Sequence, residues 1–210
     1  PGSFWSGVEE ISGVFGTGDD DVTVGAQLSD LWGNEGTDKL TLDYSGVLPD
    51  GRTVTSIDQL ILVGDNRYPE AVNLSDGSRV SFRIHQFESY DITGSDGNDR
   101  IDVSESPAGN VLYGLGGNDR FTGGPGSDTL HGGDGDDTLS GGAGADRLLG
   151  GAGEDVFTGV DASDIVEGGT GHDTLDFDIS GEANGRTVNI LSGPGSFWSG
   201  VEEISGVFGT

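Results

Sequence analysis

The chain has 210 residues, of which 41 are glycine and none is cysteine or methionine, and 37 acidic against 9 basic residues give a net charge of −28. Such a charge repels nucleic-acid phosphates, the irregular glycine spacing with 6 prolines is not that of collagen, and no apolar run approaches the ~18 residues of a membrane span. Because the chain begins at Pro1 without a methionine, we expect it to be a piece of a longer protein.

A long duplication joins the two ends of the sequence. Residues 1–17 read PGSFWSGVEEISGVFGT, and residues 194–210 repeat them without a change. The duplication is either artificial or the sign of a tandem array with a unit of 193 residues. We assign residues 1–14 to the end of a β spacer, of which residues 194–207 are the copy.

A shorter, nine-residue period begins at Phe15. Copies occupy residues 15–23, 24–32 and 33–41, and the middle copy keeps only Leu31 at its apolar position. We therefore assign residues 15–41 to a short repeat run.

Residues 42–93 lose the nine-residue period and are assigned to a β spacer. Within this spacer we expect strands over residues 53–63 and 81–92 and a hairpin turn at Asp76-Gly77.

The main run of repeats is assigned to residues 94–176. After a first copy at residues 94–102, seven consecutive nonapeptides fill residues 114–176 without a shift in register. Five of the seven match G-G-x-G-x-D-x-U-x at every specified position, where U is a large apolar residue. Residues 177–210 again lack the pattern and are assigned to a second β spacer.

Each nonapeptide divides into a six-residue turn and a three-residue strand. Side chains alternate along a strand, so only U faces inward, whereas neighbours such as Thr129 and His131 face solvent. The expected inward residues are Phe121, Leu130, Leu139, Leu148, Phe157, Val166 and Leu175. Two nonapeptides make an 18-residue coil, and stacked coils form parallel sheets. The predicted fold is therefore all-β, a parallel β-roll or β-solenoid interrupted by β spacers that bind no calcium.

Stacking would place the repeat aspartates in two columns. One edge would carry Asp119, Asp137, Asp155 and Asp173, and the other Asp128, Asp146 and Asp164. Carboxylates held so close repel one another unless a cation lies between them. Calcium takes six to eight oxygen ligands, which carboxylates and turn carbonyls can supply, whereas magnesium demands a tighter octahedron and zinc prefers clustered His or Cys.

At these residues the chain resembles the RTX (repeats-in-toxin) family of secreted calcium-binding proteins. The resemblance implies that each Ca²⁺ lies between turns of successive coils. The earlier turn would give the carbonyls of its second and fourth residues and its Asp, and the later turn the carbonyls of its first and third residues and its Asp. We expect about five to seven Ca²⁺ ions per chain on this basis.

The resemblance can be carried over residue by residue. The implied sites are Gly124, Gly126 and Asp128 with Gly141, Ala143 and Asp146; Gly133, Gly135 and Asp137 with Gly150, Ala152 and Asp155; Gly151, Gly153 and Asp155 with Gly168, Thr170 and Asp173; and Leu115, Gly117 and Asp119 with Gly132, Asp134 and Asp137. A further site combines Gly142, Gly144 and Asp146 with Gly159, Asp161 and Asp164, although Val160 and Ala162 replace glycines there. Another combines Gly16, Gly18 and Asp20 with Gly33, Glu35 and Asp38. Asp99 is a last candidate ligand, 20 residues rather than 18 before Asp119 because of the insert at 103–113.

Motifs of enzymes are not found. H-E-x-x-H and G-x-S-x-G do not occur, and His85, His131 and His172 have no Ser or Cys partner in the pattern, so we expect surface histidines and no enzymatic activity.

Two functions of different classes fit this sequence. The first is a calcium-binding structural repeat of a large secreted bacterial fibre, adhesin or surface-layer-like protein, with neighbouring copies of itself as partners. The alternative is the calcium-binding C-terminal secretion and folding module of an exported RTX enzyme or toxin. The duplication favours the first. Because RTX proteins generally leave the cell by type I secretion, the resemblance implies a secreted, extracellular or cell-surface location.

Overall fold

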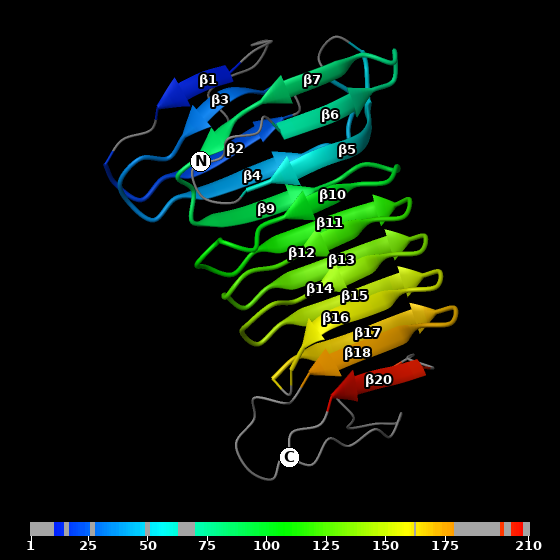
Figure 1. Cartoon of the computed structure of the whole chain (residues 1–210). Coiled ribbons are helices and arrows are strands. Elements are labelled where there is room, and N and C mark those ends of the chain that lie inside the picture. Colours follow the sequence, from blue (N-terminus) through cyan, green and yellow to red (C-terminus); the bar gives the residue numbers. More distant parts are fainter. Residues whose placement is uncertain are drawn as a thin grey trace.

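The computed structural model describes residues 11–14, 17–25, 28–48, 51–62, 70–161, 163–178, 198–199 and 203–207, and every regular element in these ranges is a strand. The strands climb as an elongated roll with two facing sheets (Figure 1). The expected all-β, parallel solenoid is therefore confirmed. Gly16 and most of the assigned end segments 1–14 and 177–210 lie outside the described residues.

One face of the roll is an eight-stranded sheet in the order β19-β17-β15-β13-β11-β9-β4-β2. Its strands are β2 (Asp21–Gly25), β4 (Lys39–Asp43), β9 (Ser89–Thr93), β11 (Val111–Gly116), β13 (Thr129–Asp134), β15 (Arg147–Ala152), β17 (Ile165–Thr170) and β19 (Trp198–Ser199). All of its neighbours pair in parallel.

The other face is a nine-stranded sheet in the order β20-β18-β16-β14-β12-β10-β5-β6-β7. Its strands are β5 (Val54–Ile61), β6 (Glu70–Leu74), β7 (Arg79–Phe82), β10 (Arg100–Asp102), β12 (Arg120–Thr122), β14 (Thr138–Ser140), β16 (Val156–Val160), β18 (Thr174–Asp178) and β20 (Glu203–Val207). A third, three-stranded sheet joins β1 (Ile11–Val14), β3 (Leu28–Trp32) and β8 (Ile84–His85).

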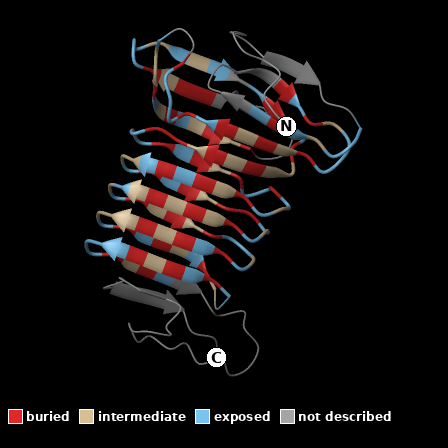
Figure 2. Ribbon diagram, turned by 180° about the vertical axis from the view of Figure 1, so that it is seen from behind, coloured by how far each residue is buried: buried red, intermediate tan, exposed pale blue. Residues whose placement is uncertain are grey.

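The core of the roll follows the nine-residue period. Leu130 pairs with Leu148 on one face and Phe121 with Leu139 on the other, so each partner lies one 18-residue coil further on. All seven residues expected to face inward have no exposed surface: Phe121, Leu130, Leu139, Leu148, Phe157, Val166 and Leu175. Figure 2 shows these buried positions as columns that run up the roll. One apolar side chain per strand therefore builds a continuous core.

The spacer at residues 42–93 joins the roll instead of forming a separate unit. β4 of the short repeat run pairs in parallel with β9, and β9 pairs in parallel with β11 of the main run. The two runs are offset by two residues along the strand, because Leu40 aligns with Tyr90, whose own N–H bonds to Asn110 in the following coil. A shift of two keeps side chains on the same face, so the core stays continuous.

The expected hairpin at Asp76-Gly77 is confirmed. β6 and β7 pair antiparallel, Gly77 has φ of 82°, and Asp76 Oδ1 accepts the N–H of Ser78 at 2.8 Å. The expected single strand over residues 81–92 is wrong. It divides into β7, β8 and β9, because Gln86 takes φ of 61° and its carbonyl packs on Gly33, which turns the chain between two sheets.

Candidate metal centre

Two columns of aspartates run along opposite edges of the roll, as the repeat spacing predicts. In each column the backbone N–H of one aspartate donates to Oδ1 of the aspartate one coil further on. On the first edge these bonds join Asp99 to Asp119 (2.8 Å), Asp119 to Asp137 (2.7 Å), Asp137 to Asp155 (2.9 Å) and Asp155 to Asp173 (3.0 Å). On the second edge they join Asp20 to Asp38 (2.8 Å), Asn110 to Asp128 (2.7 Å), Asp128 to Asp146 (2.9 Å) and Asp146 to Asp164 (2.9 Å). One oxygen of each carboxylate therefore holds two coils together.

The second carboxylate oxygen divides these aspartates into two groups. Oδ2 is buried and accepts no hydrogen bond from any described residue in Asp38, Asp119, Asp137, Asp146 and Asp155. Oδ2 of Asp99, Asp128 and Asp164 instead accepts a backbone N–H of its own turn at 2.7 Å, from Ser95, Gly124 and Asp161 respectively. A buried acceptor without a partner costs about 1–3 kcal/mol, and more when charged. The first group therefore needs a cation or a proton.

The backbone of the turns follows the same division. In what we call an open turn, the second and fourth residues have φ between 78° and 147°; these pairs are Asn34 and Gly36, Leu115 and Gly117, Gly133 and Gly135, Gly142 and Gly144, Gly151 and Gly153, and Gly169 and Gly171. The turns of Asp99 and Asp128 have a positive φ at neither position, and we call them and the turn of Asp164 closed.

Two of the closed turns have a cause in the sequence. Pro125 follows Gly124, and the residue before a proline is driven towards an extended conformation. In the turn of Asp164 the second residue is Val160, whose branched side chain is strongly disfavoured at positive φ. These two turns therefore satisfy their own aspartates.

In an open turn, two kinds of oxygen converge on one point between the coils. A Cβ added to Gly132 would collide with Oδ2 of Asp137 and would lie 2.8 Å from the carbonyl oxygen of Gly150 in the next coil. At Gly150 the same construction meets Oδ2 of Asp155 and, at 2.5 Å, the carbonyl oxygen of Gly168. Carboxylate and carbonyl oxygens are the ligands that calcium takes.

Side chains alone do not make this centre. Within the described ranges, no three His, Cys, Asp or Glu side chains gather so that they could hold a metal by themselves. An ion at an open turn must therefore complete its shell with backbone carbonyls. A zinc site would instead need a His or Cys cluster.

Burial without a cation also moves the pKa values of these carboxyl groups. Burial, together with the neighbouring column carboxylates, raises the pKa of Asp119 to about 8 and that of Asp137 to about 7, although each accepts a backbone N–H that lowers it. The same causes raise the pKa of Asp146 and of Asp155 to about 6. The open turns therefore hold a proton far more readily than a free aspartate, which is the behaviour of a vacated cation ligand.

A comparison with protein families identifies these turns. The model of the RTX calcium-binding nonapeptide repeat matches four copies, at residues 91–105, 108–139, 122–157 and 140–175. This part of the chain is an RTX calcium-binding repeat region. RTX nonapeptide repeats bind Ca²⁺, and the open turns described above are where their oxygens converge. No curated protein matches the chain. No helix among the described residues is long and apolar enough to cross a membrane.

The fold brings the paired turns of the RTX repeats together as the ligand sets require. Both turns are open in three predicted sites, those that start with Asp119, Asp137 and Asp155. The site that starts with Asp128 has a closed earlier turn, and the site that starts with Asp146 has a closed later turn. Asp99 stacks on Asp119 despite its offset of 20, because the two extra residues are taken up in the loop between β10 and β11. The ligand sets themselves remain predictions.

The remaining predicted ligands are also placed by the columns. Gly18 lies under Gly36, where an added Cβ would be 2.5 Å from the Gly18 carbonyl oxygen, while its predicted companion Gly16 lies outside the described residues. The side chains of Glu35, Asp134 and Thr170 are exposed, which agrees with a role through their carbonyls alone.

Two members of the second column were missed from the sequence. Asn110 lies 18 residues before Asp128, so the spacing alone could have revealed it. Glu88 accepts the N–H of Asp38 through Oε2 at 2.7 Å, the position that an aspartate 18 residues later takes elsewhere. Its separation of 50 residues from Asp38 gives no periodic signal.

The expectation of a surface position is wrong for His85. This side chain is 6 % exposed, stacks on Trp32 at 4.0 Å between ring centroids, and its Nε2 has no hydrogen-bond partner among the described residues. The cause is the pairing of β8 with β3, which carries His85 into the packed end of the roll. His172 is exposed, as expected.

Proposed function

We propose that this chain is a calcium-binding structural repeat of a large secreted bacterial fibre, adhesin or surface-layer-like protein, in which calcium drives folding and stiffening outside the cell. The observation that carries the proposal is the column of buried carboxylate oxygens without partners, at Asp38, Asp119, Asp137, Asp146 and Asp155. The role is structural and not enzymatic.

The charge supports a folding role for the ion. At −28 the chain repels itself, and about five Ca²⁺ ions would reduce the charge to about −18. Each strand of the repeats buries one inward side chain, which is too little to balance the entropy of ordering nine residues. Ions that bind only the folded coil add their binding free energy to its stability. RTX proteins are typically exported, and a cell exterior supplies the calcium.

The two copies of the duplicated segment support a tandem array. Residues 11–14 and 204–207 share the sequence ISGV, but the first copy pairs with β3, which follows it, and the second with β18, which precedes it. In a solenoid the preceding and following coils lie on opposite sides of a strand. A strand between two units could therefore take both partners, with Leu175 paired to Ile204 and Ile204 to the next copy of Leu28. Units would then join as one rod.

The test uses circular dichroism and small-angle scattering of the chain and of a chain with two units. We expect little regular structure in chelator, β-structure with calcium at roughly 10⁻⁴–10⁻³ M, and a two-unit particle about twice as long at unchanged cross-section. A spectrum that chelation does not change would refute the folding role. Two globules on a flexible joint would refute the fibre and favour the secretion module of an exported enzyme or toxin.

A further inference from the structure

The short repeat run ends at the turn of residues 33–38, and this turn has the features of a calcium turn. Asn34 and Gly36 have φ of 78° and 147°, the conformation of the second and fourth residues in the open RTX turns. Asp38 has no exposed surface, and its Oδ2 is one of the buried oxygens without a partner. In the RTX repeats such an oxygen faces the turn of the next coil, 18 residues on. Here the chain departs into the spacer instead.

The spacer returns to this turn with oxygen atoms in the equivalent places. A Cβ added to Gly33 would collide with the carbonyl oxygen of Gln86 and would lie 2.7 Å from Oδ2 of Asp38. Gln86 therefore takes the place of the first residue of the next turn, as Gly150 does above Gly132. Glu88 takes the place of its aspartate, because its Oε2 accepts the N–H of Asp38.

The backbone around Glu88 is held firmly in this position. Its own N–H donates to the carbonyl oxygen of Asp38 at 3.0 Å, and its carbonyl oxygen accepts the hydroxyl of Ser106 at 2.6 Å. The turn at this point has only Gln86 and Phe87 before Glu88, whereas an RTX turn has five residues before its aspartate. The longer glutamate side chain compensates for the shorter turn, since it reaches the N–H that an aspartate reaches elsewhere.

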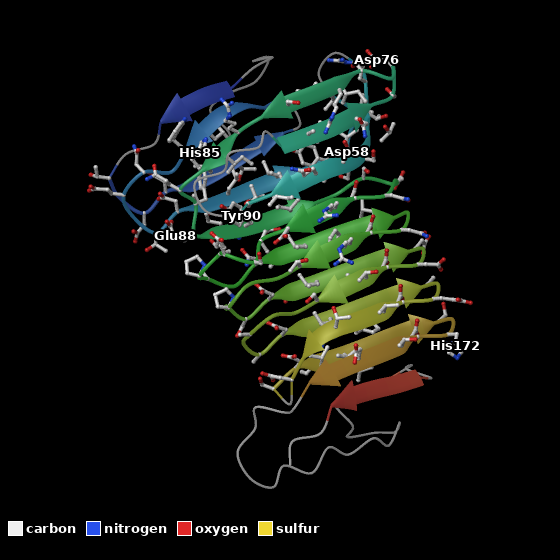
Figure 3. The ribbon with its side chains drawn as sticks, viewed as in Figure 1. Asp58, Asp76, His85, Glu88, Tyr90 and His172 are labelled. Atoms are coloured by element: carbon white, nitrogen blue, oxygen red, sulfur yellow. The ribbon has the colours of Figure 1, made fainter. Side chains whose placement is uncertain are left out.

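From this geometry we propose a further Ca²⁺ site that no nonapeptide supplies, formed by Oδ2 of Asp38, the carbonyl oxygen of Gln86 and the second carboxylate oxygen of Glu88. The carbonyls of Asn34 and Gly36 complete the earlier half by their place in the open turn. A pocket of about 520 Å³ lies beside Gln86 and Glu88, so water and ions reach the site. Glu88 lies at the edge of the roll, below His85 in the view of Figure 3.

The consequence is that calcium couples the spacer to the repeats. The site joins residues 33–38 to residues 86–88 across 50 residues of chain, so its ion stabilises the closure of the whole inserted segment. The inference rests on the proposed calcium-dependent folding, because it extends the same kind of ion to a turn outside the nonapeptides.

The test counts the calcium ions bound by the full chain by native mass spectrometry and calorimetry. Glu88→Gln keeps the acceptor for the N–H of Asp38 and removes the charge, so we expect one ion fewer per chain and an otherwise unchanged spectrum of β-structure. Glu105→Gln is the matched control, because Glu105 lines the same pocket but touches no open turn, and it should keep the full number of ions. Glu88→Asp keeps the charge and shortens the reach, and it should also lose one ion.

The outcomes separate the two proposals. A wild-type chain that folds without calcium would refute the proposed function itself. A wild-type chain that folds with calcium, while both Glu88 variants keep its full number of ions, would overturn only the site at Glu88. Should Glu88→Gln be unfolded in calcium, the count for Glu88→Asp decides alone.

Discussion

Asp137→Asn separates the structural role of the aspartate columns from their metal-binding role. Asp137 belongs to two predicted sites, as the later aspartate with Asp119 and the earlier one with Asp155. Asparagine keeps an oxygen for the N–H of Asp119 and replaces the unpartnered Oδ2 by an NH₂ group beside the carbonyl oxygen of Gly150. The substitution should therefore have opposite effects with and without calcium.

The magnitudes follow from the buried charge and from ligand binding. Without calcium, the rise of the pKa of Asp137 from 3.8 to about 7 corresponds at ~1.4 kcal/mol per tenfold change to at most roughly 4 kcal/mol. Solvent screening at the turn reduces this value, so we expect a gain of about 2 kcal/mol at about pH 8. With calcium at 10 to 100 times its dissociation constant, each lost site removes about 1.4–2.7 kcal/mol, or roughly 3–5 kcal/mol for two.

Circular dichroism measures both effects. In chelator the variant should show more β-structure than the wild type, and in saturating calcium its urea midpoint should be lower. Asp136→Asn is the matched control, because Asp136 is exposed and its Oδ1 accepts the N–H of Glu154, a bond that asparagine preserves. The reasoning is refuted if Asp137→Asn destabilises the chain equally in both conditions, or if Asp136→Asn has the same effect.

Three further predictions concern pH, site quality and the core. Because the folded pKa values of Asp119, Asp137, Asp146 and Asp155 lie above the unfolded value of 3.8, their stabilising contribution without calcium is complete below about pH 4 and is lost as the pH rises through about 6 to 8. Acidification in chelator should therefore increase β-structure, and it should weaken calcium binding because protons compete; a calcium midpoint independent of pH would contradict this. Asp146→Ala should lower the calcium stoichiometry and cooperativity more than Asp164→Ala, because Oδ2 of Asp164 already accepts the N–H of Asp161, and calorimetry that ranks them in reverse would show the second column to be wrongly assigned. Leu139→Ala should lower the unfolding free energy in calcium by about 2–5 kcal/mol, since Leu139 is fully buried, whereas Thr138→Ala on the outer face should change it little.

The sequence by itself determined the repeating part of this protein. Phe121, Leu130 and Leu139 could be placed inside, and Asp119 and Asp137 in one column, because a strict period of nine residues with two strands per coil leaves no other register. Asn110 was within reach of the same reasoning, since its place follows from the 18-residue coil.

Only the tertiary structure decided what happens where the period breaks. The pairing of β4 with β9, the burial of His85 and the return of Glu88 to Asp38 depend on which coil the spacer packs against, and no spacing in the chain encodes that choice. The division into open and closed turns was also hidden behind nearly equal motifs. A single residue at the second or third position of a turn, such as Val160 or Pro125, decides whether the backbone can take a positive φ there, and hence whether the aspartate of that turn faces a cation or its own backbone.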